Sequence, residues 1–205
     1  MHAKNSVVGV VIAGGRSVRF GGEKAIAPFA ARPLLLWAAE RLARVSSQVA
    51  VNARPGTGAA ELADASGLML LPDAPGDPLG PLSGVRVGLA WAQSVGASVL
   101  AVSPCDAPLL PDDLYERLLV AAGAGAAMAV TEDGRQPLCA VWPVSARAMV
   151  NAALAGGAHP PTWSVLEAAG AVKVHFDRAA DFANLNTPED LARLEAMRAG
   201  AAYQR

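Results

Sequence analysis

The stretch Val7–Ala25 reads VVGVVIAGGRSVRFGGEKA, and the interpretation of the rest of the chain depends on it. A short run of β-branched apolar residues stops at Gly14-Gly15 and is followed by three cations, Arg16, Arg19 and Lys24. A strand that leads into a glycine-rich, basic loop favours polyphosphate binding, because glycines let backbone N–H groups approach phosphate oxygens and the cations neutralise charge. The alternative is a tight turn with solvated arginines, which the density of glycines and cations disfavours.

Two common phosphate-binding signatures do not fit this loop. A P-loop needs Gly-Lys-Ser/Thr, whereas Glu23 stands between Gly22 and Lys24, and Ala25 replaces the hydroxyl residue. A dinucleotide fingerprint needs Gly-x-Gly-x-x-Gly, and Ser17 occupies the position of its second glycine. The loop is therefore expected to bind phosphate in another way.

The composition predicts one globular domain spanning residues 1–205. The chain is 53% hydrophobic and 17% charged, with a net charge of −1, which argues against disorder and against nucleic acid or an anionic membrane as a partner. Cys105 and Cys139 are too few for a disulfide framework. The sequence shows no signal-peptide core and no run near the ~20 apolar residues of a membrane span, so a cytoplasmic location is expected.

Strand and helix patterns alternate along the chain, which predicts a three-layer α/β/α sandwich with a mostly parallel, Rossmann-like sheet. The expected strands are 7–12, 48–52, 68–71, 99–103, 126–131, 138–142 and 171–176, with a hairpin at Asp133-Gly134. The expected helices are 33–45, 58–65, 81–94, 111–122, 145–155, 164–169 and 187–199. In the fourth, Asp112 and Asp113 would lie in the first turn, where the helix dipole favours anions. In the last, Thr187 would be the N-cap.

The predicted chemistry lies where parallel strands end, because ligands of open sheets bind at the carboxyl ends of the strands. Asp73 and Asp106 each follow an expected strand. Asp106 is the best Mg²⁺ ligand, since this cation prefers carboxylate oxygens and substrate phosphates; the alternative is an Asp that only caps a turn. Lys24 is expected to reach the phosphates. Cys105 has no histidine near it in the sequence and is rejected as a nucleophile.

The loop resembles the signature of the molybdenum cofactor guanylyltransferases, a family of nucleotidyltransferases. The family pattern Leu-Ala-Gly-Gly-x-Ser-x-Arg-Met-Gly-x-Asp-Lys-Ala is matched by IAGGRSVRFGGEKA, in which Glu23 replaces the Asp with a side chain one methylene longer. The segments VAVN, PCDAP, DAPGDPLGPLSGVRVGL and FANLNTPEDLARL also resemble the family, in the same order.

This resemblance implies a fold like that of the nucleotide-diphospho-sugar transferases and assigns site residues. The catalytic residues would be Lys24, Arg19 and Asp106, with Mg²⁺ on Asp106. The nucleotide would be bound by Ile12, Ala13, Gly14, Gly15, Lys24, Asn52, Asp73, Gly80 and Asp106. Asn184 and Asn186 could equally line the site or build a turn.

The implied reaction transfers GMP from GTP to the phosphate of molybdenum-molybdopterin and releases pyrophosphate. Molybdenum-insertion proteins and recipient molybdoenzymes would be its protein partners. The residues themselves do not identify guanine, so a cytidylyltransferase of the same cofactor and a sugar-phosphate nucleotidyltransferase stay open. A non-catalytic nucleotide-binding relative is the alternative from another class. Gln136-Pro137 stands where the family often has His-Pro, in a region expected to face the second substrate.

Overall fold

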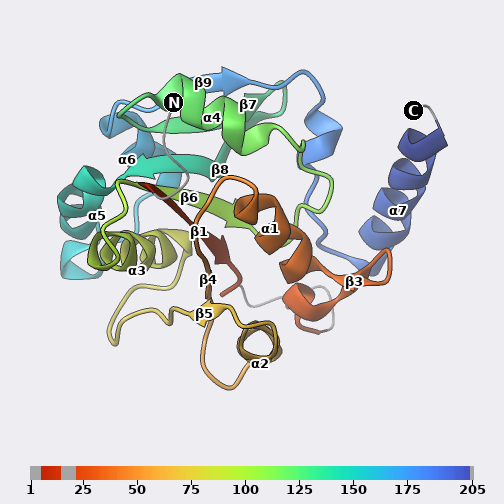
Figure 1. Ribbon diagram of the computed structural model, residues 1–205, viewed down its shortest axis with the longest axis horizontal. Helices are drawn as coiled ribbons and strands as arrows, with labels where there is room; N and C mark the ends of the chain where they lie inside the picture. The colour runs from red at the N-terminus through yellow and green to blue at the C-terminus, as the bar shows by residue number, and fades with distance from the viewer. Residues whose placement is uncertain (1–5, 15–21, 204–205) are drawn as a thin grey trace.

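The structure is a computed structural model that describes residues 6–14 and 22–203. Within these ranges, one seven-stranded sheet has the order β5-β4-β1-β6-β8-β7-β9 (Figure 1). The strands are β1 Val7–Ile12, β4 Val49–Asn52, β5 Met69–Leu70, β6 Val99–Pro104, β7 Ala127–Thr131, β8 Gly134–Pro143 and β9 Val172–His175. Among them, β8 alone runs against its neighbours β6 and β7, and the other pairs are parallel.

The first four strands of this order form a doubly wound core. The chain passes from β1 to β4 and β5 on one side and then crosses to β6 on the other. The point where the direction of winding reverses therefore lies between the carboxyl ends of β1 and β6. Open α/β sheets bind ligands at such a point.

Helices cover both faces of the sheet. They are α1 Leu34–Ala43, α2 Gly58–Ala65, α3 Pro81–Ser94, α4 Leu114–Ala122, α5 Arg147–Ala153, α6 Thr162–Ala168 and α7 Pro188–Tyr203. Residues of α3, α5 and α6 share one core cluster, and residues of α1 and α4 share another on the opposite face. The expected three-layer α/β/α architecture is confirmed.

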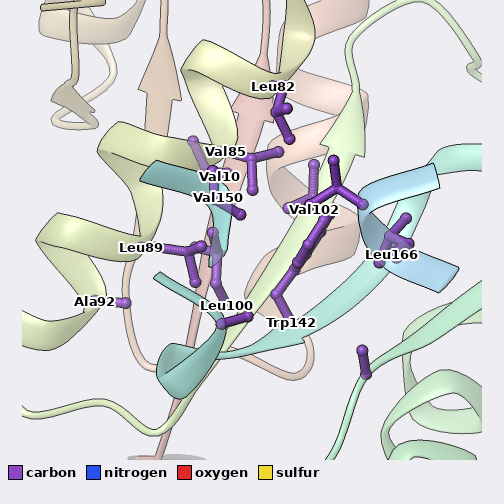
Figure 2. Close-up of a cluster of buried hydrophobic side chains, with 14 of the residues drawn as sticks. Val10, Leu82, Val85, Leu89, Ala92, Leu100, Val102, Trp142, Val150 and Leu166 are labelled. Atoms are coloured by element: carbon purple, nitrogen blue, oxygen red, sulfur yellow. The ribbon is translucent and has the colours of Figure 1, made fainter. Parts of the chain in front are cut away.

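Alternating strand residues fill these two cores, because successive side chains of a strand point to opposite faces of the sheet. Figure 2 shows one cluster, in which side chains of α3 lie against Val10 of β1 and against Leu100 and Val102 of β6. Trp142 of β8 is fully buried in the same cluster. Both faces of the central strands are therefore buried, which explains their continuous apolar sequence.

Most predicted elements are confirmed within a few residues, including the hairpin of β7 and β8. The prediction for the helix 111–122 is wrong at its start, since α4 begins at Leu114 and Asp113 is its N-cap. The N–H of Leu114 donates to the carbonyl of Pro111, so a turn precedes the helix. Asp112 lies outside α4, where it forms an ion pair with Arg44.

A small hairpin and the last helix form an additional unit beside α1. The hairpin consists of β2 Pro28–Phe29 and β3 Arg32–Pro33, and the sequence did not indicate it. Figure 1 shows α7 next to β3, on the side of the molecule away from α3 and α5. Leu185 and Leu194 pack with Phe29 in a separate apolar cluster. This unit fixes the chain that leads into α7.

Candidate active site

A pocket of about 380 Å³ opens at the winding reversal between β1 and β6. Its walls come from the segments that follow β1, β4, β5 and β6, from the start of α3 and from β8. The lining residues are Ile12, Ala13, Gly14, Lys24, Ala25, Asn52, Arg54, Asp73, Leu79, Gly80, Pro81, Pro104, Cys105, Asp106 and Leu138. The pocket therefore lies where the topology predicts a ligand site.

Lys24 and Asp106 form an ion pair on the wall of this pocket. The ammonium Nζ of Lys24 lies 2.7 Å from Oδ2 of Asp106 and also donates to Oδ1 of Asn186 at 2.9 Å. The side chains of Lys24 and Asp106 are 15% and 20% exposed, so the pair is largely shielded and yet open to the pocket. The contact brings together three separate segments of the sequence.

The backbone around Asp106 is held by neighbouring elements. Its carbonyl accepts the N–H of Leu185 at 2.7 Å, and the N–H of Cys105 donates to the carbonyl of Ile12 at 3.3 Å. Two residues later, the carbonyl of Pro108 accepts a hydrogen bond from Nη2 of the buried Arg41 at 3.1 Å. Burial lowers the pKa of Arg41. These bonds hold the backbone segment that carries the Asp106 carboxylate.

Asn186 is positioned by the start of α7. The Asp190 carboxylate accepts the N–H groups of Asn186 and Thr187, each at 3.0 Å, and Thr187 Oγ1 accepts the N–H of Asp190 at 3.2 Å. These reciprocal bonds form the predicted cap. The hydrogen bond from Arg193, followed by the one from the Asn186 N–H, lowers the pKa of Asp190 to about 2.

Asn52 and Asp73 form a second polar pair in the lining of the pocket. The Asn52 amide donates to Oδ1 of Asp73 and to the carbonyl of Leu71, each at 2.9 Å. Asn52 is 3% exposed and lies at the last paired position of β4, opposite Ile12. Gly84 of α3 packs directly against its amide oxygen. The Asn52 side chain is therefore held by the segment that follows β5 and by α3.

The start of α3 forms the outer wall. Gly80 has a φ of 149°, a conformation that favours glycine, and it precedes Pro81 at the first helical position. The imidazole of His159 occupies the space where a side chain at Gly80 would lie, and its Nε2 accepts the N–H of Leu82 at 3.2 Å. Leu79, beside them, is 70% exposed at the pocket.

Neither cysteine has the environment of a reactive thiol. Burial, and secondly the Asp106 charge, raises the pKa of Cys105 to about 12. Burial also raises the pKa of Cys139. A thiol is nucleophilic as the thiolate, so Cys105 lines the pocket as a neutral group. This agrees with its rejection as a nucleophile from the sequence.

The structure places eight of the predicted site residues around one pocket: Ile12, Ala13, Gly14, Lys24, Asn52, Asp73, Gly80 and Asp106. The predictions for Gly15 and Arg19 lie outside the described residues. Sequence reasoning missed Arg54 and Leu138. Arg54 follows β4 and could have been found by the rule that placed Asp73. Leu138 was not identifiable in this way, because it comes from the early part of the antiparallel strand.

Two oxygen donors meet at the Lys24 ammonium, one from the pocket lining and one from the segment before α7. Asp106 supplies a carboxylate and Asn186 an amide oxygen, and both already hold the cationic Lys24 ammonium. In the described part of the chain, no cluster of three or more His, Cys, Asp or Glu side chains could ligate a metal. One carboxylate and one amide oxygen are donors of the kind that a hard divalent cation shares with substrate phosphates.

Comparison with known proteins identifies the family. The model of the MobA-like NTP transferase domain matches residues 9–172. A molybdenum cofactor guanylyltransferase of Rhodobacter capsulatus is 40% identical over 192 residues, which cover 92% of this chain and 95% of that one. One from Cereibacter sphaeroides is 39% identical over 191 residues, with the same coverage of the two chains.

Solved structures show the same fold. The molybdopterin-guanine dinucleotide biosynthesis protein A from Archaeoglobus fulgidus superposes with a TM-score of 0.75 at 23% identity, over 94% of this chain and 99% of that one. In the ranges that the structure covers, no helix has the length and apolarity to cross a bilayer. The chain is a nucleotidyltransferase and belongs to the MobA-like NTP transferase family, together with the molybdenum cofactor guanylyltransferases.

Proposed function

We propose that this nucleotidyltransferase transfers GMP from GTP to the phosphate of molybdenum-molybdopterin, releasing pyrophosphate and forming the guanine dinucleotide cofactor. The observation that carries the proposal is the identity of 39–40% to molybdenum cofactor guanylyltransferases over 92% of the chain. The pocket at the winding reversal, with a cation and a carboxylate in contact on its wall, supports it.

In this proposal the nucleotide lies along the pocket from α3 to Lys24. The nucleoside contacts Asn52, Asp73 and Gly80, and the phosphates lie near Gly14 and Lys24. Gly15 and Arg19, proposed from the sequence, extend the phosphate contacts. The lining of the pocket offers the Asn52 amide, carboxylates, backbone groups and the Lys24 ammonium for such contacts.

The chemistry needs no covalent protein intermediate. A phosphate oxygen of the acceptor attacks the α-phosphorus of the nucleotide in line with the departing pyrophosphate. The protein contributes positioning of the two substrates and neutralisation of the developing charge. Lys24 neutralises phosphate oxygens, and it exchanges its contact with Asp106 for the triphosphate when the nucleotide binds.

A divalent metal is typical of nucleotidyltransferases, and we propose Mg²⁺ with Asp106 as its protein ligand. The bound cation supplies Lewis-acid neutralisation of the phosphoryl oxygens. Asp106 and Asn186 would hold it. The bonds from Leu185 and to Asp190 hold the backbones of these two residues.

We also propose a cellular location and protein partners for the enzyme. We place it in the cytoplasm, where it would receive the metallated pterin from molybdenum-insertion proteins and hand the dinucleotide to recipient molybdoenzymes. Nucleic acid and membranes are not among the proposed partners, in keeping with the net charge of −1.

The test is calorimetric titration of the protein with GTP, CTP, ATP and UTP, each with Mg²⁺, followed by a pyrophosphate-release assay with the molybdenum-loaded pterin. Selective GTP binding with acceptor-dependent pyrophosphate release is expected. Selective CTP binding would instead indicate a cytidylyltransferase with the same mechanism. Binding of GTP without release in the presence of the acceptor would indicate the non-catalytic alternative, and binding of no nucleotide would contradict the proposal.

A further inference from the structure

We propose that Glu23 is a positioning residue for the transfer reaction, which fastens the end of the glycine-rich segment to α2 and thereby holds Lys24 at the pocket. This inference rests on the proposed function for its catalytic consequence. The contact itself is a property of the fold and can be tested without any turnover.

The Glu23 carboxylate binds the first two backbone donors of α2. Its Oε2 accepts the N–H of Gly58 and its Oε1 accepts the N–H of Ala59, each at 2.7 Å. The first N–H groups of a helix have no partner within the helix, and the helix dipole favours a negative charge there. Thr57 Oγ1 accepts the third, from Ala60, at 3.3 Å. A residue 35 positions away in the sequence thus completes the cap.

The space for this contact depends on Gly58. A Cβ atom at this position would lie 3.0 Å from Oε2 of Glu23 and 2.9 Å from Cδ1 of Ile26. A side chain here would require the end of Ile26 to move and the Glu23 carboxylate to give by a few tenths of an ångström, so glycine leaves room for the carboxylate at the backbone. The close approach of the carboxylate to the start of α2 therefore suits a glycine at position 58.

The bonds to α2 determine the position of Lys24 because the two residues are consecutive. Lys24 begins a short 3-10 helix, η2 Lys24–Ile26, and Ala25 is buried against Ala59 and Ala63 of α2. The backbone of Lys24 is thus held on both sides, by Glu23 and by Ala25. From this anchored backbone the Lys24 ammonium reaches Asp106 at 2.7 Å.

The length of the Glu23 side chain matters for this role. Shortening it to Asp withdraws the carboxylate by about one carbon–carbon bond, roughly 1.5 Å, so it cannot accept both N–H groups from the present backbone position. A Glu23→Gln change keeps one acceptor oxygen and loses the charge. The Lys24 side chain should therefore be held best in the wild type, less well in the Gln and Asp variants, and least in the Ala variant.

The decisive experiment is a double-mutant cycle between Glu23 and Lys24 in the pyrophosphate-release assay. Glu23→Ala should lower kcat/KM about 10- to 100-fold, because a displacement near 1 Å of a positioned group can cost that much. In the Lys24→Ala background the same change should have less than about a twofold effect. Glu61→Ala, which removes an exposed acidic residue from the same helix turn, is the matched control and should leave the rate unchanged.

A second measurement does not depend on turnover or on the identity of the nucleotide. Acylation of Lys24 by acetic anhydride, followed by peptide mass spectrometry and normalised to Lys173, should be about threefold or more faster in Glu23→Ala, since the paired ammonium is released from its fixed contact. Glu61→Ala should match the wild type. If the proposed function is wrong, the wild type shows no pyrophosphate release, but the difference in Lys24 acylation between the wild type and Glu23→Ala persists.

The proposal is overturned if Glu23→Ala lowers kcat/KM equally in both backgrounds, because the residue then acts independently of Lys24. It is also overturned if the folded Glu23→Ala protein shows the wild-type ratio of Lys24 to Lys173 acylation. Should Glu23→Ala fail to fold, the Asp and Gln variants provide the same cycle with a smaller perturbation.

Discussion

Replacing Gly84 by Ala should weaken nucleotide binding far more than the matched change at Gly88. Both glycines lie in α3, a 14-residue helix. A Cβ at Gly84 would collide with the amide oxygen of Asn52 and lie 2.8 Å from Cδ1 of Ile12. A Cβ at Gly88 would instead lie 2.9 Å from Cδ2 of Leu100 in the core. Gly84→Ala therefore displaces a residue of the site, whereas Gly88→Ala displaces a residue of the core.

The expected magnitudes follow from these contacts. In a helix Ala is favoured over Gly by about 1 kcal/mol, whereas overpacking costs about 1–3 kcal/mol. Each variant should lose about 1 kcal/mol of stability, which lowers Tm by about 2–4 °C for a chain of this size. Displacing Asn52 also breaks its 2.9 Å bond to Asp73. Such a bond contributes about 1 kcal/mol, so Kd for GTP with Mg²⁺ should rise about fivefold in Gly84→Ala.

The assay combines thermal unfolding by circular dichroism with calorimetric titration of GTP. Gly88→Ala should show the loss in Tm and an unchanged Kd. If both variants lose the same stability and bind GTP as the wild type does, Asn52 is not a nucleotide contact and the reasoning is refuted. A rise in Tm for Gly84→Ala would show that α3 moves freely away from β4.

The other predictions concern charge, backbone strain and pH. Asp106→Asn should reduce pyrophosphate release at least 100-fold with little change in Tm, because it removes charge and keeps shape; a full rate would contradict the metal assignment. Ala31→Gly should raise Tm by about 2–4 °C, since Ala31 has a φ of 61° in the β2–β3 turn, where glycine is unstrained; a lower Tm would show that the turn is not strained. The pKa of Asp190 is lowered from 3.8 to about 2, so its stabilisation is present above its unfolded pKa and lost as the pH falls from about 4 to 2. In Asp190→Asn the stability should depend less on pH, so the urea midpoint of unfolding should change less between pH 5 and pH 3 than it does in the wild type.

The sequence predicts the elements whose signals are local. The predicted bounds of α2 and α3 agree with the structure, and Pro81 marks the start of α3 in both. The β2–β3 hairpin escapes such reasoning because Ala30 and Ala31 occupy its positive-φ positions, where a sequence reader expects Gly or Asn. The turn is held from outside, by the carboxylate of Glu195, which accepts the N–H of Ala30.

The residues of the candidate site also fall into two groups, those that the sequence predicts and those that depend on tertiary contacts. Asp73 and Asp106 could be placed from the rule that ligands bind at strand ends, and the pocket includes both. The contact of Lys24 with Asn186 could not be predicted, since it depends on where α7 docks. The bonds from Glu23 to α2 could not be predicted either, because the cap of that helix comes from a distant segment. Distant pairings of this kind need the tertiary structure.

The contact between Lys24 and Asn186 joins residues 162 positions apart. A chain growing on the ribosome can pair β1, β4 and β6 long before Asn186 emerges, so the sheet precedes the complete pocket during synthesis. The polar end of the site is then assembled only when the last helix docks against the hairpin formed near the beginning of the chain. Nascent chains should therefore acquire a stable core before they acquire the lysine–asparagine contact, and catalytic competence should be a late event in the maturation of each molecule.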